Sequence, residues 1–131
     1  MTNHAANRSL TMLRIIVAGL MLIHGLHRAL HSGHVAGFGD YLIAEGLPAG
    51  HLVATIITGW EILGGTWLAI GWKARIPALV FATELAIGMV MVHASEGWFV
   101  VGGGRNGVEY SVVLIAALLA VAWASPIRPD A

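Results

Sequence analysis

Four long apolar segments dominate this chain of 131 residues and leave little between them. Each has about the 20 mostly apolar residues that an α-helix needs to cross the hydrocarbon core of a bilayer. Their apolar positions do not alternate, and the segments are too long for strands, so we expect helices. The segments cover about 9–30, 51–71, 75–94 and 108–124. The sequence therefore predicts an all-α integral membrane four-helix bundle, with residues 1–131 in a single transmembrane domain.

The composition excludes several other classes of protein. Hydrophobic residues make up 57% of the chain and charged residues only 11%, against about 25% charged in a soluble domain. With so few polar side chains, the chain cannot cover the surface of a soluble globular protein. It is also too hydrophobic to stay disordered in water. Lys and Arg balance Asp and Glu, 7 against 7, so no nucleic-acid partner is expected. The absence of cysteine excludes thiol chemistry and thiolate metal sites.

The cations at the ends of the segments predict the topology. Lys and Arg are enriched in cytoplasmic loops of membrane proteins, and five of them fall on one side of the expected bundle. These five are Arg8, Arg14, Lys73, Arg75 and Arg128, whereas Arg28 and Arg105 fall on the other side. We therefore expect the side with five cations, and with it both termini, to be cytoplasmic.

Two loops face outward in this topology. In the longer one, 31–50, Val35, Phe38, Tyr41 and Leu42 fit the apolar face of a short helix on the membrane surface. The loop 95–107 carries aromatic residues followed by glycines. It is expected either to dip into the outer leaflet or to be flexible.

Six ionisable residues fall within the apolar segments. A charged group near the centre of a spanning helix costs about 3 kcal/mol, so such groups face the protein interior and mark pathways, sites or internal pairs. The six are Arg14, His24, Glu61, Glu84, His93 and Glu109. Fully ionised, one arginine and three glutamates would leave the interior with two excess negative charges. A binding or proton-handling site is therefore favoured; the alternative is that Arg14 pairs with one glutamate and the others fix helix register.

Glu61 is the strongest single candidate, because Gly64 and Gly65 follow it. Two glycines let a neighbouring helix or a flat ligand approach the backbone closely. Tight helix packing alone is the other interpretation of these glycines, and it is the one slightly favoured.

Histidines form a second pattern, with His24, His27, His31 and His34 spaced 3, 4 and 3 apart. This spacing places them within one arc of a helix, where imidazoles can bind zinc, copper or haem iron. A solvated stripe at the outer interface is favoured instead, and no metal site is predicted.

A set of short motifs follows in a fixed order along the chain. The motifs are Arg14, His24–Gly25 with Arg28, Gly46–Leu47–Pro48, Glu61 with Gly64–Gly65, Leu68 and Gly71, then Arg75, His93 and Gly107–Val108–Glu109. In their order and spacing they resemble those of the DoxX family of bacterial and archaeal four-helix membrane proteins. The likeness runs from about residue 14 to 124, and Glu84 lies outside the family pattern.

The resemblance implies a place in the prokaryotic cytoplasmic membrane and a link to redox chemistry. Members of the family include a small subunit associated with a thiosulfate:quinone oxidoreductase, and others found alongside redox or sulfur-handling partners. The implied ligand is a membrane quinone. The implied residues are Arg14, His24, Glu61, His93 and Glu109.

Two functions are consistent with these features. In the first, the chain is a subunit of an oxidoreductase complex, not a complete enzyme, and binds quinone between its helices. His24 and His93 would contact the carbonyls, Glu61 and Glu109 would relay protons, and Arg14 would keep one carboxylate charged. The cofactor-binding set would be Arg14, His24, Glu61, Gly64, Gly65, Glu84 and His93. In the second, the chain is a non-enzymatic scaffold or a small carrier of protons or a weak acid, with self-association completing its pathway.

Overall fold

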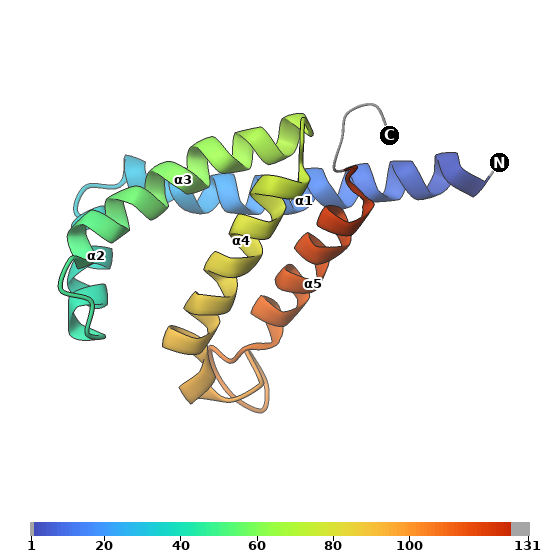
Figure 1. Cartoon of the computed structure of the whole chain (residues 1–131). Helices are drawn as coiled ribbons and strands as arrows, with labels where there is room; N and C mark the ends of the chain where they lie inside the picture. Colours follow the sequence, from blue (N-terminus) through green and yellow to red (C-terminus); the bar gives the residue numbers. More distant parts are fainter. Residues whose placement is uncertain (1, 127–131) are drawn as a thin grey trace. The chain divides into compact units, whose positions relative to one another are not determined.

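The structure is a computed structural model that describes residues 2–126, and every element in that range is helical (Figure 1). The prediction of an all-α fold is confirmed for these residues. The α-helices are α1 (Thr2–Leu30), α2 (His34–Ala44), α3 (Gly50–Ile70), α4 (Arg75–Gly88) and α5 (Glu109–Ala124). A π-helical turn, Met89–His93, and a 3-10 turn, Ala94–Glu96, extend α4.

Three helical stretches are long and apolar enough to cross a membrane: Asn3–Leu30, Gly50–Ile70 and Arg75–Glu96. They correspond to the first three predicted segments. The fourth segment forms α5, which has 16 residues and measures about 24 Å at 1.5 Å per residue. That length is short of the roughly 30 Å hydrocarbon core. The fourth span and the cytoplasmic position of both termini therefore stay predictions.

The chain forms two compact units, which are described separately. One unit combines the residues up to Val17 with those from Gly71 onward, and the other runs from Ala18 to Ile70. The long helix α1 contributes its first half to one unit and its second half to the other.

In the unit 18–70, α2 packs against α3. A Cβ on Gly39 would meet the Cα of His51 at 2.8 Å, so the absence of a side chain lets the two helices come together. Leu42 is buried and Phe38 is half-buried. The short surface helix predicted in the loop 31–50 is therefore present as α2, and its apolar face is turned onto the protein.

In the other unit, α4 and α5 lie side by side (Figure 1). Phe81, Ala78 and Leu118 are fully buried in this unit. Pro77 stands in the first turn of α4, where a helix does not need its missing N–H. The loop between α4 and α5 is tied down by backbone hydrogen bonds, including Asn106 N–H to Val100 O at 3.2 Å and Gly107 N–H to Phe99 O at 3.0 Å.

Candidate functional site

Glu61 forms an ion pair with Arg28. Arg28 Nη1 lies 2.5 Å from Glu61 Oε2, and the two side chains are only 17% and 6% exposed. Glu61 is in the middle of α3, and Arg28 is in the last turn of α1. A charge-assisted hydrogen bond of this kind is among the strongest that side chains make, and it removes the net charge from an otherwise apolar helix pair.

Two further side chains hold the Arg28 guanidinium. Thr58 is one helical turn before Glu61, and its hydroxyl accepts a hydrogen bond from Arg28 Nη1 at 3.2 Å while donating one to Ala54 O at 2.7 Å. The ring of Phe38, in α2, lies 4.5 Å from Arg28 Cζ, a cation–π distance. Side chains from α1, α2 and α3 thus meet at this one point, which we call the Arg28–Glu61 site (Arg28, Phe38, Thr58 and Glu61).

Glycines bring the helices close enough for this pairing. A Cβ on Gly25 would lie 2.8 Å from the Cβ of Glu61, and one on Gly65 would lie 3.2 Å from Ala18 O. A Cβ on Gly64 would meet the ring of Trp60, on the same helix, at 2.8 Å. Protein atoms therefore occupy the space beside both glycines, but only Gly65 marks a close approach of α1 to α3.

His24 lies one turn before Arg28 on α1 and is exposed. Further along, the rings of His27, His31 and His34 pack on one another with centroids 4.1 to 5.2 Å apart. His31 Nδ1 lies 2.7 Å from His27 O. Within residues 2–126, no group of three potential ligands is arranged to hold a metal ion.

Arg14 and Glu84 belong to the other unit and are half-buried. A Cβ on Gly71 would lie 2.6 Å from Arg14 Cζ, so the guanidinium covers the turn after α3. Gly71 has a φ of 90°, a backbone conformation that favours glycine.

His93 and Glu109 both hold the loop between α4 and α5. His93 Nδ1 lies 2.7 Å from Asn106 O, and Glu109 Oε1 accepts a hydrogen bond from Val100 N–H at 2.9 Å. His93 ends the π-helical turn, a kind of irregularity that is frequent at functional sites. These contacts hold the loop at both of its ends; the two behaviours expected for it, a dip into the outer leaflet and flexibility, stay predictions.

The predicted site residues thus divide between the two units, with His24, Glu61, Gly64 and Gly65 in one and Arg14, Glu84, His93 and Glu109 in the other. Sequence reasoning gave no site role to Arg28, Thr58 or Phe38. One usable signal was Gly25, which precedes Arg28 by one turn and marks where another helix approaches; Thr58 likewise precedes Glu61 by one turn.

The fold and the site define a class: a helical membrane protein with an ion pair enclosed where apolar helices meet. Comparison with protein families makes this more specific, because the model of the DoxX family matches residues 9–94, more than half of the chain. The chain belongs to the DoxX family. The match begins within α1, continues through α4 and the π-helical turn, and ends before α5. Neither the curated proteins nor the solved structures gave a match.

Proposed function

We propose that this protein is a membrane subunit of a redox complex in the prokaryotic cytoplasmic membrane, and that it binds a quinone at the Arg28–Glu61 site. The observation that carries the proposal is the pairing of a buried carboxylate with a guanidinium inside apolar helices. Ionisable groups at such depth are costly and usually serve a pathway or a site.

The donor set fits a quinone head group, which is flat and carries two carbonyl acceptors. Both hydrogen bonds of the Arg28 guanidinium to Glu61 and Thr58 come from Nη1, and the group carries further N–H donors on Nη2 and Nε. The Phe38 ring offers an aromatic surface at the same place. His24, one turn away on α1, would supply a second donor.

Each residue has a distinct role in this proposal. Arg28 would donate to a carbonyl oxygen and hold Glu61 in place, while Glu61 would take up or release a proton at its carboxyl group. A bound quinone would supply the capacity to accept two electrons with two protons. The electrons would come from a partner subunit. Arg14, Gly64, Gly65, Glu84, His93 and Glu109 stay predicted site residues.

Tryptophan fluorescence tests quinone binding directly, because Trp60 precedes Glu61 on α3. We expect a short-chain ubiquinone to quench the fluorescence of the purified protein in detergent, and quinone to be recovered on lipid extraction. Trp60→Phe should remove most of the quenching, and Arg28→Gln should weaken it about tenfold. Trp123→Phe is the control, since Trp123 is 90% exposed at the far end of the chain. Quenching that is equal in wild type and Arg28→Gln, with no quinone extracted, would overturn the proposal.

A second function, that of a non-enzymatic scaffold, is supported by the tight packing around the ion pair. The ion pair is neutral as a whole, and glycines let α1 pack closely against α3 beside it. Such packing suits a protein that only holds helices or partner proteins together. A proton or weak-acid carrier is the related possibility. Glu61→Gln distinguishes these functions in reconstituted vesicles: loss of proton uptake indicates a carrier, and a change in thermal stability alone indicates a scaffold.

A further inference from the structure

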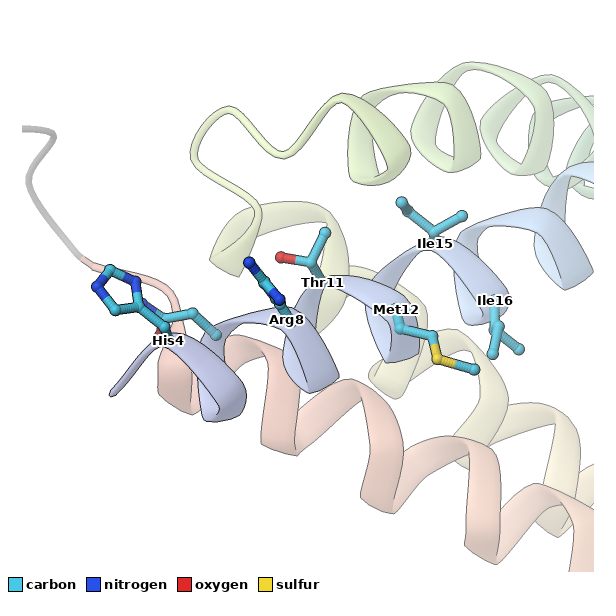
Figure 2. Close-up of a pocket in the computed structure, with 7 residues that line it drawn as sticks. His4, Arg8, Thr11, Met12, Ile15 and Ile16 are labelled. Atoms are coloured by element: carbon cyan, nitrogen blue, oxygen red, sulfur yellow. The ribbon is translucent and has the colours of Figure 1, made fainter. Parts of the chain in front are cut away.

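The first half of α1 carries a groove that no role described so far uses. It has a volume of about 540 Å³, and the side chains that line it project from successive turns of the helix (Figure 2). The lining residues are His4, Asn7, Arg8, Thr11, Met12, Ile15 and Ile16. All of them come from α1, and their positions recur every three or four residues (4, then 7 and 8, 11 and 12, 15 and 16), so they share one face.

This face changes character along the helix. The first part has only polar side chains, with an imidazole, an amide, a guanidinium and a hydroxyl, and the last part has only apolar ones. Met12 is 65% exposed and Ile15 is 52% exposed, so the apolar part is open to its surroundings. Figure 2 shows the order directly, from His4 and Arg8 to Ile15 and Ile16.

The length of the helix places this change at the edge of the bilayer. The span Asn3–Leu30 has 28 residues and measures about 42 Å, whereas the hydrocarbon core is about 30 Å thick. For a helix along the bilayer normal, about eight residues therefore lie outside the hydrocarbon. If these are the polar ones at the start, His4 and Arg8 lie at the level of lipid head groups, and Met12 to Ile16 lie among acyl chains.

The positive charge of this face of α1 indicates which kind of ligand it binds. No Asp or Glu precedes Asp40 in the chain, so no acidic residue of α1 offsets the charge of Arg8. A guanidinium with neighbouring amide, hydroxyl and imidazole groups is suited to a phosphodiester. We infer that this face of α1 is a binding site for an anionic glycerophospholipid, whose phosphate meets Arg8, His4 and Asn7 and whose acyl chain lies along Met12, Ile15 and Ile16.

The inference does not depend on quinone binding and is tested on the full chain by native mass spectrometry. Delipidated protein is titrated with dioleoyl phosphatidylglycerol or with dioleoyl phosphatidylcholine. We expect the anionic lipid to be retained preferentially, and Arg8→Gln to weaken its binding about fivefold, the effect of one basic residue at a membrane surface. Arg105→Gln is the matched control: it removes an exposed arginine that lies outside the groove and should leave binding unchanged.

A second comparison separates a lipid site from a site for phosphate alone. Dihexanoyl phosphatidylglycerol has the same head group with short chains, and should bind more weakly than the dioleoyl lipid. Glycerol phosphate should not displace the dioleoyl lipid at equal concentration. Equal retention of the two head groups by the wild type, or no effect of Arg8→Gln, would overturn the inference, as would a dimer formed through this face in place of lipid binding.

Discussion

Arg28 and Glu61 are tolerated inside apolar helices because each offsets much of the cost of burying the other. An isolated charge in a medium of low dielectric is strongly unfavourable, and a well-aligned pair recovers much of that cost. Thr58 adds a hydroxyl that accepts from Arg28 Nη1, and the Phe38 ring covers the guanidinium. The stabilisation therefore belongs to the group, and removing either charged member, Arg28 or Glu61, leaves the other as an uncompensated buried charge.

This reasoning gives a prediction for stability. Arg28→Met should lower the free energy of unfolding by about 3 kcal/mol, because it leaves the Glu61 carboxylate buried without its cation. The double variant Arg28→Met/Glu61→Met should recover to within about 1 kcal/mol of wild type, since both charges are then gone. Titration with SDS in mixed micelles measures both.

Arg105→Met is the control for the loss of an arginine as such, because Arg105 is exposed. If the double variant were as unstable as Arg28→Met, the pair would not be the source of the effect.

At the level of elements, the crossing of α1 and α3 depends on glycine. Gly25 sits where any Cβ would meet Glu61 Cβ at 2.8 Å and the backbone N of Ile62 at 3.1 Å. The contact involves backbone, so the helices themselves have to move if a side chain is added.

We therefore expect Gly25→Ala to destabilise the protein by about 1–3 kcal/mol through overpacking. A Cβ on Gly19, on the same helix, would have no packing neighbour within 4 Å. Gly19→Ala should accordingly be neutral or stabilising by up to about 1 kcal/mol, as in any helix. Parallel thermal unfolding of the two variants in one detergent measures the difference; equal effects would contradict close packing at Gly25.

The connection from α4 to α5 is the second element whose form depends on particular side chains. Glu109 accepts a hydrogen bond from Val100 N–H, and His93 contacts Asn106 O. The loop thereby presents Trp98 and Phe99, each about half exposed, on a backbone held at several points.

Glu109→Ala should release this loop. Without its carboxylate acceptor the Val100 amide should exchange hydrogen about tenfold faster, as measured by hydrogen–deuterium exchange with mass spectrometry. Glu96→Ala changes an exposed carboxylate just before the same loop and should leave the exchange unaltered. Exchange that is unchanged in Glu109→Ala would mean that the carboxylate does not hold the loop.

At the scale of the whole molecule, the four predicted segments make a topology that labelling of introduced cysteines can test. The chain contains no cysteine, so single cysteines can be introduced without removing native ones. If all four predicted segments span, Ser32→Cys and Ser95→Cys should react with an impermeant maleimide in intact cells. Lys73→Cys and Ser125→Cys should react only after permeabilisation, because they would be cytoplasmic. Equal labelling of Ser95→Cys and Ser125→Cys in intact cells would show that α5 does not cross.

The helices were predictable because the local sequence of each segment determines that it is helical. Twenty apolar residues in a row have few alternatives to a buried or membrane helix, and the apolar pattern at 35–42 was enough to indicate α2. The pairing of Glu61 was not predictable to the same degree. Arg14 was considered as a partner for a buried glutamate, but the partner of Glu61 is Arg28, which the topology had placed at the outer end of its helix.

The physical reason is reach. A side chain of arginine length near the end of one helix can reach a carboxylate in the middle of another only if the backbones come close, and that closeness depends on glycines of both helices. Sequence alone determined the membrane class, the helices and the presence of costly charges among them. Tertiary structure alone decided which charge neutralises which, because an ion pair between helices depends on how they cross and on which residues face one another there.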